Sequence, residues 1–262
     1  MVLFTHEIRQ GIKMLLIWSV AVSAIIIACM ACFPEVEAQA EEIREAFATM
    51  GAFTSAFGLD IIDMTDPLGF YGLDCAAVLA FGGGIYASYL GARMLAKEEA
   101  EKTSEFLLPH PRSRTAIIAA KLSAVFSLVL AFNAICTIAA VASFLLIDKE
   151  IPIKAFALFQ LAQLLLHLEI AGIAFGVSAL LGRGSAGFGV GFAALLYFLN
   201  IAANISDKWS FLRYITPFSY ADPANVIPNV EINSKYLLFG VVYTLLGVLF
   251  AFYWYTRKDI AV

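Results

Sequence analysis

The chain has 262 residues, of which 61% are hydrophobic and 15% are charged, and its formal net charge is −4. Together with a mean hydropathy of +0.83, this composition excludes an ordinary soluble globular protein and indicates an integral membrane protein. The sequence also lacks the basic surface with interleaved aromatic residues that is typical of nucleic-acid-binding proteins, so no nucleic-acid partner is expected.

Six uninterrupted apolar runs are each long enough to cross a bilayer as a helix, which takes about 20 residues. In chain order they are Met14 to Phe33, Cys75 to Ala92, Leu122 to Ile147, Ala155 to Leu181, Ala186 to Ile205 and Tyr236 to Tyr255. Each run must be helical, because backbone groups cannot stay unpaired in hydrocarbon. We therefore predict an all-α integral membrane protein with six transmembrane helices in a single transmembrane domain, residues 1–262. The third and fourth runs exceed the length of a span, which predicts tilting, kinking or projection beyond the lipid.

Residues 1–13 mix apolar and charged side chains ahead of the first run. Apolar Phe4 and Ile8 alternate with polar Glu7 and Arg9, as in an amphipathic helix that lies on a membrane surface. This pattern predicts an N-terminal interfacial elbow helix. A signal peptide fits less well, because the apolar run that follows is longer than a typical signal core.

The distribution of lysine and arginine sets the orientation. Placing the N-terminus in the cytoplasm puts 11 of the 17 basic residues inside, as the positive-inside rule requires. The first connection, residues 34–74, then lies outside, and it carries nine acidic residues against the single basic residue Arg44. We predict a protein of the cell (inner) membrane with both termini cytoplasmic.

Two external segments have structure of their own. Within the acidic loop, the stretch from Glu35 to Met50 is predicted to form an amphipathic helix that caps the outer mouth. Residues 206–235 are rich in aromatic residues and proline, which favours re-entrant or interfacial turns in an aromatic belt at the membrane surface.

Between the second and third runs, residues 93–121 form a cytoplasmic segment of distinctive pattern. It has an acidic first turn at Glu98 and Glu99, an apolar ridge at residues 106–108, two prolines and a basic exit at Arg114. Such a pattern predicts a short helix at the membrane surface that offers a face to a soluble partner. Contact with lipid headgroups alone is disfavoured, because anionic lipid repels the glutamates.

This segment and the topology together resemble the membrane subunits of type 2 ATP-binding-cassette (ABC) exporters. In these permeases the second connection commonly reads E-E-x-x-G-T-x-E-x-L-L-x-x-P-x-S-R, followed by a lysine. The residues that match in register are Glu98, Glu99, Thr103, Glu105, Leu107, Leu108, Pro111, Ser113, Arg114 and Lys121. The departure is Lys102, where the family usually has glycine; a lysine there favours a helix that continues to Thr103 rather than one broken before it.

The resemblance implies a permease subunit whose energy comes from a separate soluble ATPase. That partner carries ATP and Mg, while this chain binds no cofactor and pairs with a copy of itself or a related permease. The resemblance also implies a docking site for the ATPase. Its expected residues are Glu98, Glu99, Glu101, Thr103, Glu105, Phe106, Leu107, Leu108, Pro111 and Arg114.

Polar residues inside the apolar runs are the candidates for a substrate path. They are Asn133, Gln160, Gln163, His167, Glu169 and Asn200. At 100° per residue, Gln160, Gln163 and His167 share one helical stripe, while Glu169 lies nearly opposite Gln160. Two interpretations remain open for each residue, namely contact with substrate and hydrogen bonding between helices.

No sequence pattern supports catalysis by the chain itself. It lacks a GxxxxGK[ST] loop for phosphates, and the three histidines lie in separate segments without a metal-binding motif. Two alternatives to the permease are an ion- or proton-coupled carrier using His167 and Glu169, which predicts a repeat between the halves, and an intramembrane hydrolase using Glu98, Glu99 and His167.

The four cysteines all lie in apolar runs. Cys29, Cys32 and Cys75 are placed at similar depth, which leaves a disulfide or a soft-metal site as one interpretation. Small buried apolar side chains are the simpler interpretation.

Overall fold

The computed structural model describes residues 2–48, 51–97, 113–181 and 185–257. Its six long helices are α1 (Val2–Ala31), α6 (Ala76–Met94), α9 (Arg114–Leu146), α10 (Ile153–Ser178), α11 (Ser185–Ile205) and α13 (Ser234–Arg257). All six are long and apolar enough to cross a membrane, and the described residues contain no strand. The predicted fold class is therefore confirmed.

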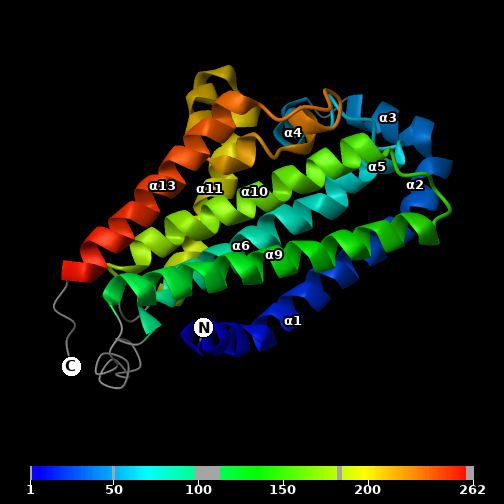
Figure 1. The fold of residues 1–262 in the computed structure, drawn as a ribbon. Coiled ribbons are helices and arrows are strands. Elements are labelled where there is room, and N and C mark those ends of the chain that lie inside the picture. Colours follow the sequence, from blue (N-terminus) through cyan, green and yellow to red (C-terminus); the bar gives the residue numbers. More distant parts are fainter. Residues whose placement is uncertain (1, 49–50, 98–112, 182–184, 258–262) are drawn as a thin grey trace.

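The six helices form an elongated bundle with two distinct ends (Figure 1). At one end α1 and α9 begin and α6 and α13 finish; we call this the terminal end. At the other end lie the short helices of residues 33–75 and of residues 207–226, and we call this the loop end. The 33 residues of α9 extend about 50 Å at 1.5 Å per residue, well beyond the roughly 30 Å of a hydrocarbon core.

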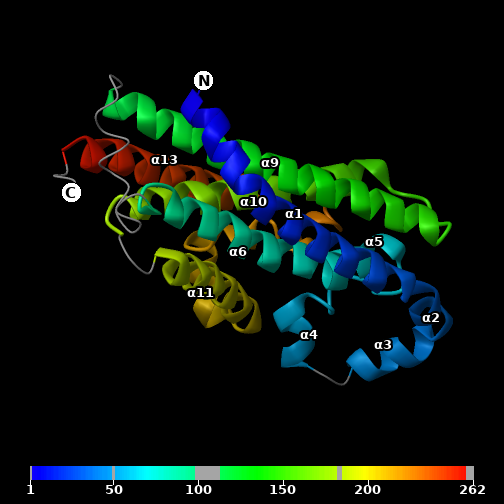
Figure 2. The same cartoon turned by 90° about the horizontal axis from the view of Figure 1, so that it is seen from below.

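Helix α10 occupies the middle of the bundle. It packs against α6, α13 and α9, while α11 packs on α6 and α1 packs on α9 (Figure 2). Close approach of α6 and α10 depends on Gly91, because a Cβ atom there would collide with the backbone at Ala171 and Phe175. Small residues at helix contacts are the usual means of packing helices in membranes.

The N-terminal elbow is continuous with the first span. Residues 2–31 form one helix, and Figure 1 shows its first turns bent away from the rest of its axis. No proline interrupts this stretch, so nothing forces a break between an elbow and a span. Gly11 lies directly against the side chain of Leu128 on α9, which holds the N-terminal turns against the bundle.

The acidic connection folds into several short helices at the loop end. They are α2 (Phe33–Ala38), α3 (Ala40–Ala48), α4 (Ala52–Phe57) and α5 (Pro67–Phe70), followed by the π-helix η1 (Tyr71–Cys75) that leads into α6. The prediction of one helix from Glu35 to Met50 was wrong, because the chain breaks at Gln39. There the backbone N–H bonds back to the carbonyl of Val36, a tighter turn that ends α2.

Residues 206–235 pack into the loop end of the bundle. They contain η2 (Asp207–Tyr214), η3 (Pro217–Ser219) and α12 (Pro223–Val226). Trp209 and Phe211 are exposed, as expected for an aromatic belt, but Phe218 and Tyr220 are buried. The belt prediction is therefore wrong for these last two side chains, because η3 lies against α10, α11 and α13.

Candidate functional site

A buried carboxylate at the terminal end lies between two lysines. Glu7 of α1 is only 2% exposed, and its carboxylate lies 3.1 Å from the Nζ of Lys121 on α9, which is fully buried. Lys97, just beyond α6, contacts the same carboxylate and also donates to the Oε1 of Gln10 at 2.7 Å. We call Glu7, Lys97 and Lys121 the connection anchor, because the two lysines flank the segment between α6 and α9.

The connection anchor ties three helices together. Besides its contact with Glu7, Lys121 donates to the backbone carbonyl of Met94 at 2.8 Å. Met94 is the last residue of α6, where carbonyl groups lack helical partners and a positive charge is favoured. Burial of an ion requires pairing and hydrogen bonding of this kind, so Lys121 holds the ends of α1, α6 and α9 in one arrangement.

Arg114 makes a second link at the same end. Its Nη1 donates at 3.3 Å to the carbonyls of both Tyr255 and Thr256 at the end of α13. The preceding residue, Ser113, caps α9 by accepting a hydrogen bond from the backbone N–H of Ala116 at 3.2 Å, which supports the helix start. Arg114 was predicted to form part of an ATPase contact, and the structure places it against α13.

The other predicted docking residues lie outside the described residues. They are Glu98, Glu99, Glu101, Thr103, Glu105, Phe106, Leu107, Leu108 and Pro111. The structure describes the chain up to Lys97 and again from Ser113 onward. In these flanking parts, Lys97, Lys121 and Arg114 link α1, α6, α9 and α13. Docking by the segment itself stays a prediction.

His167 is fully buried and joins three helices in the middle of the bundle. Its Nδ1 lies 2.9 Å from the Oδ1 of Asn133 on α9, and its Nε2 lies 3.3 Å from the carbonyl of Ala80 on α6. The Nδ2 of Asn133 donates to the carbonyl of Val129 at 2.9 Å. Two predicted path residues, His167 and Asn133, are thus brought into direct contact.

The two glutamines of the same stripe have separate partners. The hydroxyl of Tyr71 donates to the Oε1 of Gln160 at 3.2 Å, and the Nε2 of Gln160 donates to the Oγ1 of Thr137 at 3.0 Å. The Nε2 of Gln163 donates to the carbonyl of Ala221 at 2.9 Å. The stripe on α10 therefore faces α6, α9 and the 206–235 segment inside one subunit.

Asp222 is a buried charged residue that the sequence analysis did not single out. It accepts hydrogen bonds from Asn200 at 3.0 Å and from Asn204 at 2.8 Å, and it caps α12 through the N–H of Ala224 at 3.0 Å. An aspartate directly before a proline is a recognisable helix start, so the sequence did contain a signal. Asp222 fastens the 206–235 segment to α11.

We expect Asp222→Ala to detach this segment from α11. The free energy of unfolding should fall by at least about 1.5–3 kcal/mol, the value of one hydrogen bond to a charged group. The midpoint of thermal unfolding in a fixed detergent measures the change. Asp207→Ala, which alters an exposed aspartate of the same segment, is the matched control; equal losses in both variants would contradict this role.

Glu169 faces away from the stripe, as its helical position predicts. Its carboxyl group packs against Gly240 of α13, and the hydroxyl of Thr244 donates to its backbone carbonyl at 3.3 Å. The hydroxyl of Tyr220 lies close enough to interact with the carboxyl group, although the pair lacks the geometry of a hydrogen bond. His167 and Glu169 therefore lie on different sides of α10.

Among the cavities bordered by described residues, none is lined by all six predicted path residues. All are buried, and five of them form hydrogen bonds inside the subunit through their side chains. Asn200 borders a small cavity of about 50 Å³ that Asp222 and Tyr197 also line. Hydrogen bonding between elements accounts for these contacts in the conformation described, and the substrate path stays a prediction.

The cysteines form no disulfide in the structure. Cys29, Cys32, Cys75 and Cys136 all carry free thiols. Within the described ranges, no group of three or more His, Cys, Asp or Glu side chains is placed to hold a metal ion. The thiols of Cys29 and Cys75 lie near each other, within the buried contact between α1 and η1.

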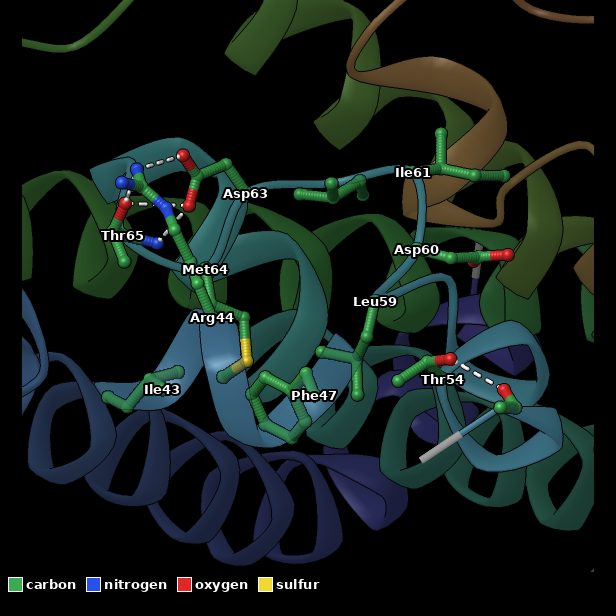
Figure 3. A pocket seen from close by; sticks show the side chains of 12 residues that line it. Ile43, Arg44, Phe47, Thr54, Leu59, Asp60, Ile61, Asp63, Met64 and Thr65 are labelled. Atoms are coloured by element: carbon green, nitrogen blue, oxygen red, sulfur yellow. Dashed lines mark hydrogen bonds and ion pairs between the residues drawn. The ribbon is translucent and has the colours of Figure 1, made fainter. Parts of the chain in front are cut away.

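A cavity of about 460 Å³ lies at the loop end, between α3, α4 and the chain leading to α5 (Figure 3). Arg44 crosses one side of it, donating to Asp63 at 2.6 Å and to Thr65 at 2.7 Å. Hydrogen bonds from Thr65, together with the Arg44 guanidinium, lower the pKa of Asp63. The stabilisation from this contact is therefore present at neutral pH and is lost as the pH falls through the lowered pKa.

We expect Asp63→Asn to weaken the hold on Arg44, which keeps its contacts with Glu41 and Thr65. Trypsin cleavage after Arg44 should speed up several-fold, because an arginine held by a carboxylate is a poorer protease substrate than a more mobile one. Mass spectrometry of timed digests measures the rate. Asp60→Asn is the matched control, since Asp60 lines the same cavity but bonds to Ser55. Unchanged cleavage in Asp63→Asn would show that the contact does not order this loop.

Comparison with known protein families assigns nearly the whole chain to one family. A family model described as ABC-2 family transporter protein matches residues 1–260, a range that contains all six long helices. The comparison with curated proteins found no match. The match confirms the family resemblance that the sequence motif and the topology indicated. Together with the six long apolar helices, it supports a multi-pass membrane protein. The chain belongs to the ABC-2 family of transporter proteins.

Proposed function

We propose that this chain is the permease subunit of an ABC exporter in the cell membrane. ATP and Mg bind a separate ATPase subunit, because this sequence has no phosphate-binding loop of its own. The observation that carries the proposal is the match of a transporter family model to residues 1–260. The excess of basic residues at the terminal end supports cytoplasmic termini.

The connection anchor gives the ATPase a mechanical link to the bundle. The ATPase docks on the segment between Lys97 and Ser113. Any displacement of that segment acts on α1 through Lys97 and Glu7, on α6 and α9 through Lys121, and on α13 through Arg114. Four of the six long helices thus share one attachment region, which supports coupled movement when the ATPases dimerise on ATP.

Two permease subunits, either identical or related, enclose the transport path. Helices α1, α11 and α13 expose many apolar side chains in the single subunit, and these surfaces are available for lipid and for a second permease. The sparse polar lining of the bundle suits an amphipathic or lipid-like cargo better than a strongly polar one. ATP-driven rearrangement of the helices then moves this cargo outward.

An ion-coupled carrier is the less favoured function. Such a carrier would use His167 and Glu169 in one path, whereas His167 faces α6 and α9 and Glu169 faces α13. The two side chains therefore lack a common water-filled route among the cavities of the described residues. This arrangement favours the ATP-driven permease.

Co-purification tests the proposal. The tagged chain is extracted in mild detergent from its native cells, and its partners are identified by mass spectrometry. The expected result is a stoichiometric P-loop ATPase, with or without a second permease. A chain that purifies alone, under conditions that keep known ABC complexes intact, would refute the proposal and make His167 and Glu169 the next residues to test.

A further inference from the structure

A second large cavity lies at the terminal end, next to the connection anchor. It measures about 510 Å³ and opens between α1, α6 and α9. Its lining residues are Glu7, Gln10, Gly11, Lys13, Met14, Ile17, Trp18, Tyr89, Leu90, Arg93, Met94, Lys97 and Leu128. Neither the family match nor the proposed transport function assigns a role to this cavity.

On both α1 and α6, the charged lining residues lie nearer the terminal end than the apolar ones that follow. Along α1 the charged Lys13 comes before the apolar Ile17 and Trp18, which lie farther from the terminal end. Along α6, which runs the opposite way, Leu90 lies farther from that end and Arg93 lies nearer to it. A cavity with basic residues near the terminal end and apolar residues beyond them matches a molecule with an anionic head and a hydrocarbon chain.

Positive charge exceeds negative charge at the terminal end of the cavity. Lys13, Arg93 and Lys97 line it, whereas Glu7 is the one acidic residue among the described lining residues and is already bracketed by Lys97 and Lys121. Lys13 is exposed and makes no ion pair with any residue in the described ranges. Among the described lining residues positive charge therefore exceeds negative charge, and Lys13 offers an exposed cation to an incoming ligand.

We propose that this cavity binds a phospholipid with an anionic headgroup. The headgroup phosphate binds among Lys13, Arg93 and Lys97, and an acyl chain lies along Ile17, Trp18 and Leu128. Basic pockets between transmembrane helices bind anionic headgroups in this way. A free phosphate ion would leave the apolar half of the cavity without an occupant.

The site adjoins the connection anchor through Lys97, which contacts both the cavity and Glu7. A bound lipid would thus bridge α1 and α6 beside the attachment of the segment between α6 and α9. The assignment of the lipid to the cytoplasmic leaflet depends on the membrane orientation proposed above. The chemistry of headgroup binding does not depend on it.

Quenching of Trp18 by brominated lipid tests the proposal. In the Trp209→Phe/Trp254→Phe background, Trp18 is the only tryptophan. The full chain is reconstituted in phosphatidylcholine vesicles that contain a minor fraction of brominated phosphatidylglycerol or brominated phosphatidylcholine. We expect the anionic lipid to quench Trp18 more strongly. Lys13→Gln should weaken this preference about fivefold, the effect of one basic residue near an anionic surface.

Matched controls separate the site from general lipid contact. Lys208→Gln removes an exposed lysine at the loop end and should keep the preference, and a chain with Trp254 alone should show none. Equal quenching by the two lipids in the parent protein, or an unchanged preference in Lys13→Gln, would overturn the proposal. Loss of quenching on addition of millimolar inorganic phosphate would instead identify a site for the free ion and would also overturn it.

Discussion

Replacing Glu7 with glutamine is expected to lower the free energy of unfolding by about 3–5 kcal/mol, the cost of removing one partner from a buried ion pair. Glu7 is 2% exposed and Lys121 is fully buried, so the variant removes the Glu7 carboxylate from beside a buried ammonium group. Titration of the purified protein with a denaturing detergent, followed by circular dichroism, measures the loss. The ends of α1, α6 and α9 should loosen together.

A matched control exists at the loop end. Glu37 pairs with Lys149 at 2.7 Å, but both side chains are partly exposed, at 45% and 31%. Glu37→Gln should therefore cost only about 0–1 kcal/mol. The double variant Glu7→Gln/Lys121→Gln should be more stable than the sum of the single losses predicts, because contacting residues couple. Equal effects of Glu7→Gln and Glu37→Gln would contradict the role assigned to the connection anchor.

Replacing Leu107 with aspartate is expected to abolish retention of the ATPase while the protein still inserts in the membrane. The resemblance makes residues 106–108 the apolar ridge of the docking segment, and a charge placed in the buried centre of an interface removes most of its affinity. Affinity purification of the variant, with the ATPase quantified by mass spectrometry, measures the effect. The expected loss is at least tenfold, which corresponds to about 1.4 kcal/mol.

The volume-conserving Leu107→Met variant is the control for this experiment. Exchange of leucine for methionine keeps the apolar contact and usually costs little, so the ATPase should remain bound. Normal retention of the ATPase by Leu107→Asp would rule out docking through this ridge. Loss in both variants would show that the position tolerates no change, and Leu108→Asp would then separate docking from folding.

Hydropathy was sufficient to predict the six spans. A run of apolar residues long enough for a bilayer has few alternatives to a helix, so the predicted second run, Cys75 to Ala92, and α6 at Ala76–Met94 differ by only two residues at most. The N-terminal elbow was harder to delimit. Residues 2–13 of the predicted elbow belong to the same helix as the first span. The elbow was hard to delimit because an amphipathic pattern alone does not mark where a continuous helix bends.

The pairing of buried polar groups could not be predicted from the sequence. Glu7 and Lys121 are 114 positions apart, and Asn133 and His167 are 34 apart. Helical periodicity correctly placed Glu169 on the opposite side of α10 from Gln160, because the angle between two residues of one helix depends only on that helix. Which helix faces each stripe depends on the packing of the whole bundle, and local pattern does not encode that.

The family motif singled out Lys121, and the structure shows what this lysine does: it pairs with Glu7. Sequence reasoning noted this lysine as the residue that follows the docking segment, but it treated Glu7 as part of a polar elbow surface. Their contact shows that the N-terminal turns of α1 are fastened to α9. An acidic residue in the first turns of a membrane protein should therefore be considered as a partner for a lysine in a later apolar helix.

The central claim is that a separate ATPase drives this permease through the segment between α6 and α9. The most direct test is vanadate-sensitive ATP hydrolysis by the co-purified complex in proteoliposomes, compared with the ATPase alone and with the complex prepared from Leu107→Asp. The account predicts hydrolysis that depends on the wild-type permease and falls to the level of the ATPase alone in the variant. Hydrolysis that is identical with and without the permease would contradict it.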